Sequence, residues 1–182
     1  LIAREPGTDS WATHPIVRGH MRSSDIDLAE FAANIVAGQP SSRPFETASE
    51  IQSVLEAITI LQEAHQYQQA FELYANRFLG DQHIDFILDN TREVYLVLNR
   101  FVQTTSLECL TEFDQGRVLN VTSEAALNVG EIDRAIPMIK KAIEIAKKEK
   151  MWKYAAWRTD KLSYMIIHRG SAMSALRIAK QA

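Results

Sequence analysis

Most of the chain repeats one pattern, in which apolar residues stand three and four positions apart. This spacing places the apolar side chains on one face of an α-helix. Thr47, with Glu50 three residues later, forms a capping-box pattern that can start such a helix. Breaks in the pattern are expected at Thr104–Ser106 and at Gly116. Helices are predicted over residues 48–64, 67–79, 82–89, 91–103, 107–113, 117–129, 131–148, 152–168 and 172–180.

The first 45 residues follow a different pattern. Residues 1–5 and 10–14 read as two short strands on either side of a Pro-Gly turn, and Pro15 fits the first turn of a helix over 15–22. A helix over 25–37 follows, and then a linker with two prolines and no periodicity. The fold class is therefore predicted as all-α with a short N-terminal β-hairpin. The predicted parts are 1–22, 23–45 and 46–182.

Glycine and proline are scarce, at 7 and 5 of 182 residues, and residues 45–136 contain no proline. Because proline breaks helix interiors and is common in turns, its absence over such a length indicates helix after helix joined by short links. Several of the glycines follow predicted helices, where glycine is a preferred closing residue. These are Gly38, Gly80, Gly130 and Gly170.

The helical part contains an internal repeat. When Gly130 is aligned with Gly170, 40 residues further on, alanines coincide five and twelve positions later. Side chains as small as alanine let two helices approach closely. A third and looser copy has His65 in the place of the glycine. The repeating unit is therefore one helix, a turn and a second helix.

This unit resembles the tetratricopeptide repeat, most closely over residues 126–136 and 141–146. The family's period is about 34 residues, so the longer period here is attributed to an extended loop at Lys148–Met151. Some of the family's aromatic residues are replaced, for example at Thr122 and Ala126, and its closing proline is missing. The resemblance implies an α-α superhelix. Its expected repeats are 46–80, a degenerate 81–104, 116–150 and 152–182.

In tetratricopeptide proteins the first helix of each pair lines a concave groove that receives a partner. The resemblance places two stripes of side chains, at spacings of three and four residues, in this groove. These groove residues are Arg117, Asn120, Glu124 and Asn128 in one repeat and Trp157, Asp160, Tyr164 and His168 in the next. Polar and aromatic side chains suit recognition of a peptide or protein. The alternative is that the stripes face another part of the intact protein.

The segment Thr13–His20 carries a second resemblance. After two short strands, it is similar to the last helix of the winged-helix domain in bacterial signal-transduction ATPases of the STAND class, which have a NACHT-type or similar nucleotide-binding core. In such proteins this junction leads into tetratricopeptide-type repeats. The resemblance implies that the chain is a piece of a longer protein. Because the first lysine is Lys140, residues 1–139 cannot hold a phosphate-binding loop, and the ATPase core is expected elsewhere in the parent protein.

Residues for catalysis or metal binding form no recognisable motif. The five histidines show no metal-ligand spacing. Cys109, the one cysteine, stands between Leu107 and Leu110 and is expected to be a buried small hydrophobe. We therefore expect no enzyme activity, no metal and no cofactor in this chain. No apolar run approaches the length of about 18 residues that a membrane span needs, and a cytoplasmic location is expected.

The net charge of −3 conceals an uneven distribution. Residues 1–130 carry 18 acidic and 8 basic side chains, whereas residues 131–182 carry 5 acidic and 12 basic ones. Six lysines form a lysine cluster: Lys140, Lys141, Lys147, Lys148, Lys150 and Lys153. One interpretation is a solvated outer face with pairs such as Glu144 with Lys148. The other is a docking surface for an acidic partner or for nucleic-acid phosphates.

Together these features predict a non-catalytic protein–protein interaction scaffold, the sensor or partner-binding arm of a larger signal-transduction ATPase. Its partner would be a protein, a peptide or an adjacent domain of the parent chain. One alternative is a stand-alone adaptor repeat that binds peptides. Another is nucleic-acid binding through the lysine cluster, which would depend steeply on salt.

Overall fold

The computed structural model describes residues 2–4, 11–13, 48–78, 91–171, 174 and 178–180. Strand β1 (Ile2–Arg4) pairs antiparallel with β2 (Trp11–Thr13). Every other described element is a helix, which confirms the predicted all-α class. The helices are α3 (Ala48–Glu63), α4 (Tyr67–Phe78), α6 (Thr91–Phe101), α7 (Thr104–Glu108), α8 (Glu112–Asn128), α9 (Ile132–Lys148) and α10 (Trp152–His168). Outside the described residues lie the predicted turn after β1, the helices over 15–22, 25–37 and 82–89, the linker before residue 46, and most of the helix over 172–180.

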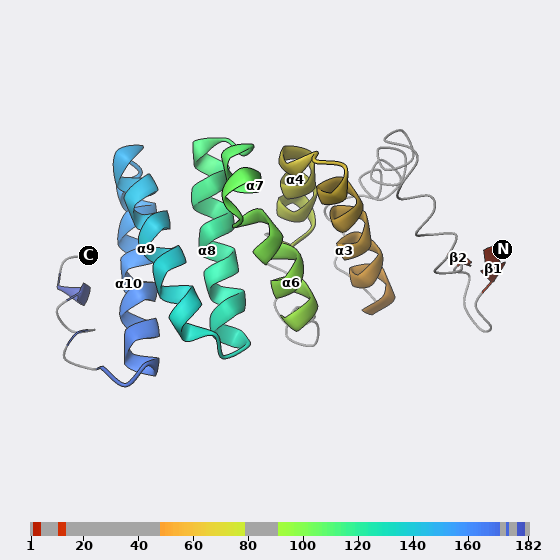
Figure 1. Cartoon of the computed structure of the whole chain (residues 1–182). Coiled ribbons are helices and arrows are strands. Elements are labelled where there is room, and N and C mark those ends of the chain that lie inside the picture. The colour runs from red at the N-terminus through yellow and green to blue at the C-terminus, as the bar shows by residue number, and fades with distance from the viewer. Residues whose placement is uncertain are drawn as a thin grey trace.

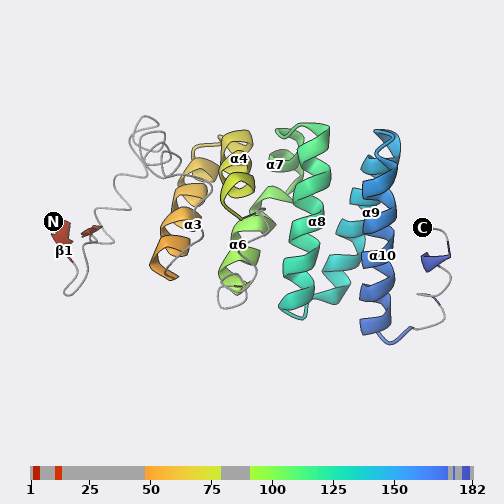
Figure 2. The ribbon, with the colours of Figure 1, turned by 180° about the vertical axis from the view of Figure 1, so that it is seen from behind.

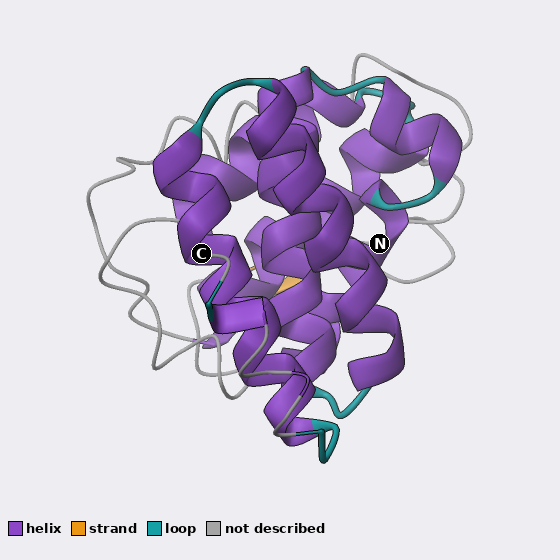
Figure 3. Ribbon diagram, turned by 90° about the vertical axis from the view of Figure 1, so that its left-hand side faces the viewer, coloured by secondary structure: helices purple, strands orange, loops and turns teal. Residues whose placement is uncertain are grey.

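The helices stand side by side in a row from α3 to α10 (Figure 1), and the view from behind shows the same order (Figure 2). Viewed along the row, they overlap one behind another (Figure 3). The last three helices are equal in length, at 17 residues each. The turns between them, 129–131 and 149–151, are equal as well. The extra length of the 40-residue period therefore lies in the helices, and the predicted extended loop at Lys148–Met151 is wrong.

Four helices end in the same backbone arrangement. After α8, the amide of Gly130 donates to the carbonyl of Leu127 at 3.0 Å, and the amide of Glu131 donates to that of Ala126 at 2.8 Å. This pair of hydrogen bonds ends a helix when the residue after its last turn adopts the left-handed conformation. The left-handed residues are His65 (φ 60°), Gly130 (φ 85°), Lys150 (φ 57°) and Gly170 (φ 90°). His65 thus shares its backbone conformation with the two glycines, and Lys150 shares it as well.

The chain between α6 and α8 differs from the sequence-based prediction. The helical path is broken at 102–103, Thr104–Ser106 begins the short helix α7, and a second break follows at 109–111. Helix α8 starts at Glu112 because the Thr111 hydroxyl accepts a hydrogen bond from the Asp114 amide at 3.2 Å, which caps the helix. It then continues through Gly116 without interruption. The break predicted at Thr104–Ser106 therefore lies two residues earlier, at 102–103, and the break predicted at Gly116 is wrong.

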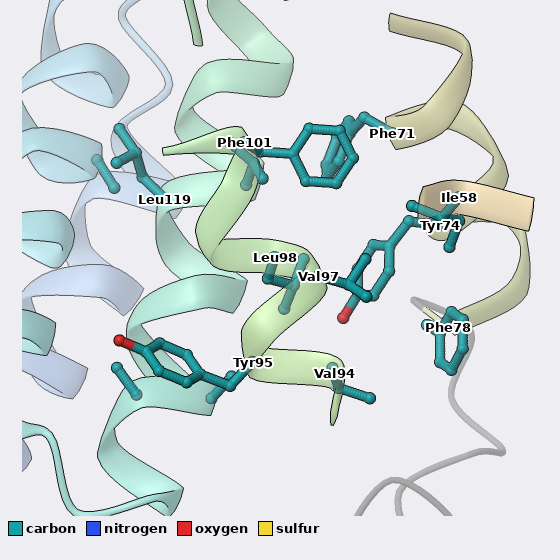
Figure 4. Packing of buried hydrophobic residues seen from close by; sticks show 14 of the residues in the cluster. Ile58, Phe71, Tyr74, Phe78, Val94, Tyr95, Val97, Leu98, Phe101 and Leu119 are labelled. Atoms are coloured by element: carbon teal, nitrogen blue, oxygen red, sulfur yellow. The ribbon is translucent and has the colours of Figure 1, made fainter. Parts of the chain in front are cut away.

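The apolar faces of these helices form a continuous core (Figure 4). Phe71 of α4 meets Phe101 of α6 edge to face, with ring centroids 5.8 Å apart. Tyr74 and Phe78 stack at 5.0 Å on the same side of α4. Where α8, α9 and α10 meet, the buried positions are often alanines, which allow the backbones to lie close together. They include Ala126, Ala135, Ala142, Ala146 and Ala155.

Candidate partner-binding face

Helices α8 and α10 run in the same direction, because α9 turns back between them. Two contacts between pairs of side chains join them directly. Glu124 of α8 forms an ion pair with Lys161 of α10, and the rings of Phe113 and Tyr154 meet edge to face at 6.4 Å. The groove residues, which all belong to these two helices, therefore lie on adjacent helices.

The four groove residues of α10 form one exposed stripe, as expected. Trp157 is 48% exposed and Tyr164 is 54% exposed, and Asp160 is exposed between them. His168 lies against Tyr164, with ring centroids 4.3 Å apart at an angle of 61°. Asp160 forms no ion pair with a described residue. Two aromatic rings, an imidazole and a carboxylate are thus available to a partner on α10.

The groove residues of α8 are mostly engaged within the protein. Arg117 contacts Asp114 at 3.3 Å, and its guanidinium lies over the ring of Phe113 at 5.4 Å. Asn120 is buried, with 4% exposure, so it does not face a partner as expected. Of the four, only Asn128 is exposed and forms no side-chain contact with the described residues. The accessible part of the predicted groove is therefore centred on α10.

Lys161 stands at the centre of this face and was not among the predicted residues. Its ammonium lies 3.4 Å from the centroid of the Trp157 ring and contacts the Glu124 carboxylate. Burial lowers the pKa of Lys161 to about 8. Its spacing of four residues from Trp157 was the sequence signal for this contact. The lysine fixes the Trp157 ring and joins α8 to α10.

All six residues of the lysine cluster are exposed. The ion pair predicted for Lys148 is formed with Glu112 of α8 and not with Glu144. This contact lowers the pKa of the Glu112 carboxyl and raises that of the Lys148 ammonium. A hydrogen bond with Glu112 raises the pKa of the Glu149 carboxyl. The other five lysines form no ion pair with a described residue.

Cys109 is exposed, so the expectation of a buried cysteine is wrong. Its thiol donates to the Thr105 carbonyl at 3.3 Å, at the end of α7. Among the described residues no group of three histidine, cysteine or acidic side chains is placed to hold a metal ion. No helix in the same ranges has the length and apolar character needed to cross a membrane.

Comparisons of the chain with protein-family models, with curated proteins and with solved structures found no match.

Proposed function

We propose that this chain is a helical-repeat scaffold of the tetratricopeptide type that binds a protein partner and performs no catalysis. The observation that carries the proposal is the exposed stripe of Trp157, Asp160, Tyr164 and His168 along α10. Large aromatic side chains held on a rigid helix are typical of residues that dominate binding energy in protein interfaces.

The regularity of the helix row supports the repeat assignment. Helices α8, α9 and α10 share one length, and the same left-handed closure follows each of them. Stacked helix pairs of this kind build extended surfaces that repeat proteins use for binding. The repeats proposed remain those of the sequence pattern, with the region of α7 as an irregular connection between them.

We further propose that the scaffold is the sensor or partner-binding arm of a larger signal-transduction ATPase. This rests on the resemblance of Thr13–His20 to the end of a winged-helix domain. The sequence of the parent gene tests this proposal. A reading frame that encodes a nucleotide-binding core upstream of Leu1 is expected, and a reading frame without one would remove the ATPase assignment.

The binding assignment is tested with a Trp157→Ala/Tyr164→Ala double variant in affinity capture from cells that express the parent gene. A Leu96→Ala variant is the matched control, because Leu96 is also a large exposed side chain, at 57%, but lies on α6. The double variant is expected to lose partners that the control retains. Partners captured equally by the double variant and by the unchanged protein would overturn the groove assignment.

A further inference from the structure

A second surface lies at the end of the helix row where α9 ends and α10 begins. Lys147 is in the last turn of α9, Lys150 is in the connecting turn, and Trp152 and Lys153 begin α10. These four residues are called the basic corner. Trp152 is 64% exposed, more than any other large apolar side chain among the described residues. The three lysines are exposed and pair with no described acidic side chain.

The charges next to the basic corner are already engaged with one another. Lys148 is paired with Glu112, and Glu149 shares a hydrogen bond with the same carboxylate. Two other aromatic rings at this end, those of Tyr154 and Phe113, pack against each other. The corner is therefore left with uncompensated positive charge around one free indole ring.

Lys150 is the left-handed residue that closes α9, where the Met151 amide donates to the Ala146 carbonyl at 2.8 Å. Its φ of 57° lies in the left-handed region, and the closures of the neighbouring helices α8 and α10 have glycines there, Gly130 and Gly170. A side chain with a Cβ costs about 1–2 kcal/mol there. His65, in the same conformation, contacts the Tyr67 hydroxyl at 3.2 Å, but the side chain of Lys150 contacts nothing comparable among the described residues. The Lys150 side chain therefore extends from a hydrogen-bonded turn and has no partner among the described residues.

We propose that the basic corner binds a partner segment in which acidic side chains flank a large apolar one. The apolar side chain would pack on the Trp152 ring, and the carboxylates would pair with the ammonium groups of Lys150 and Lys153. The inference deepens the proposed function, because it names the chemistry of one partner contact. It places that contact away from the stripe on α10.

The composition of the corner favours an acidic peptide over nucleic acid. It contains no arginine, the residue that binds phosphate with two parallel hydrogen bonds. One free indole ring does not form the succession of stacking platforms that single-stranded nucleic acid uses. Glu112 and Glu149 would also repel a backbone with closely spaced phosphates, whereas a peptide can place its few carboxylates between them.

The experiment measures fluorescence anisotropy with the full chain and labelled probes. The test peptide carries glutamates on both sides of a Leu-Phe pair. In one control peptide glutamine replaces each glutamate, and in another Gly-Ser replaces the Leu-Phe pair. A thymidine oligonucleotide of about 20 bases is the nucleic-acid probe, and all probes are compared at about 50 and about 200 mM salt.

The test peptide is expected to bind more tightly than both control peptides and than the oligonucleotide. A Lys150→Glu/Lys153→Glu variant is expected to weaken it at least about tenfold, because attraction becomes repulsion at two positions. A Trp152→Ala variant is expected to weaken it about fivefold through lost apolar contact. An Arg92→Glu/Lys180→Glu variant makes the same change in net charge elsewhere and is expected to leave affinity unchanged.

Three outcomes would overturn the inference. In the first, the test peptide fails to bind. In the second, the Arg92→Glu/Lys180→Glu variant loses as much affinity for it as Lys150→Glu/Lys153→Glu. In the third, the oligonucleotide binds more tightly than the test peptide. The last would assign the surface to nucleic acid. Trp157→Ala/Tyr164→Ala should bind the test peptide normally. If the test peptide does not bind the basic corner, the proposal that the α10 stripe binds a partner still stands. If the stripe variant retains its partners, the proposal for the basic corner still stands.

Discussion

Gly116 of α8 lies directly against the buried guanidinium of Arg158 of α10. A β-carbon at Gly116 would stand 3.0 Å from Nη1 of Arg158 and 3.3 Å from Cγ2 of Ile145. Arg158 is 2% exposed, and its Nη1 donates to the Ala142 carbonyl of α9 at 2.8 Å. One long polar side chain thus spans the three helices, and the absence of a side chain at Gly116 makes room for it.

A Gly116→Ala variant is expected to lower the free energy of unfolding. In an unconstrained helix interior the same change would raise it by about 1 kcal/mol. Here the new methyl group meets a guanidinium that a hydrogen bond and tight packing hold in place. In an Arg158→Met background the contact of the new methyl group with the guanidinium is removed. Gly116→Ala should then be neutral or stabilising. Urea unfolding of the four proteins in this double-mutant cycle measures the coupling. Equal effects in both backgrounds would contradict the contact.

Arg158 itself is expected to tolerate an apolar replacement of similar length. Burial lowers the pKa of its guanidinium, and no described carboxylate pairs with it. Because a buried charge carries a desolvation cost, Arg158→Met should change stability by no more than about 1 kcal/mol or increase it. Arg158→Ala should lose about 2–4 kcal/mol, because it leaves a cavity. Thermal unfolding distinguishes the two, and a larger loss for Arg158→Met than for Arg158→Ala would show that the charge is required.

The left-handed helix closures predict opposite effects for two substitutions. No atom lies within 4 Å of the position that a β-carbon at Gly130 would take, so Gly130→Ala would meet backbone strain alone. It should destabilise the protein by about 1 kcal/mol. Lys150→Gly should stabilise it by up to about 1 kcal/mol, because glycine adopts φ near 57° without strain. Chemical denaturation measures the change in the free energy of unfolding for both variants and so shows for each whether this free energy is lower or higher than in the unchanged protein. Destabilisation by Lys150→Gly would mean that its side chain contributes to folding.

Most helices of this protein could be predicted from the sequence because their signals are local. The apolar spacing and the closing residues place α4 and α10 within one residue of the predicted ranges. The sequence pattern wrongly predicts a break at Gly116, which lies inside α8. Its actual reason is the close approach of Arg158, a residue 42 positions later in the chain. A contact between distant residues of this kind leaves no local signal.

The candidate site was predictable to a similar degree. The stripe on α10 follows from helical spacing, and its residues are exposed. Asn120 occupies an equivalent place on α8 but is buried, because this part of α8 is covered by its neighbours. Lys161 was missed, since its role depends on Glu124 of another helix. Spacing gives the face of one helix, but which parts of that face remain open depends on tertiary packing.

The pH dependence of stability should report the environment of Lys161. Burial lowers its pKa from 10.5 to about 8 in the folded protein. Below pH 8 the ammonium is charged in both states, and the cost of burying it is present in full. Between pH 8 and 10.5 the unfolded chain binds more protons than the folded one, so the contribution of Lys161 to stability rises with pH. The Glu124 carboxylate opposes this shift, and Glu124→Gln should therefore lower the pKa of Lys161 further.

The measurement compares urea unfolding of the unchanged protein and a Lys161→Met variant at about pH 7 and about pH 9.5. The unchanged protein should gain stability relative to the variant at the higher pH, because the variant has no ammonium to discharge. Lys140→Met is the matched control, since it removes an ammonium from an exposed position on α9. A difference between unchanged protein and Lys161→Met that stays constant with pH would show that Lys161 is not held in a buried environment. A difference that moves in the opposite direction would show that the Glu124 carboxylate outweighs burial at this position.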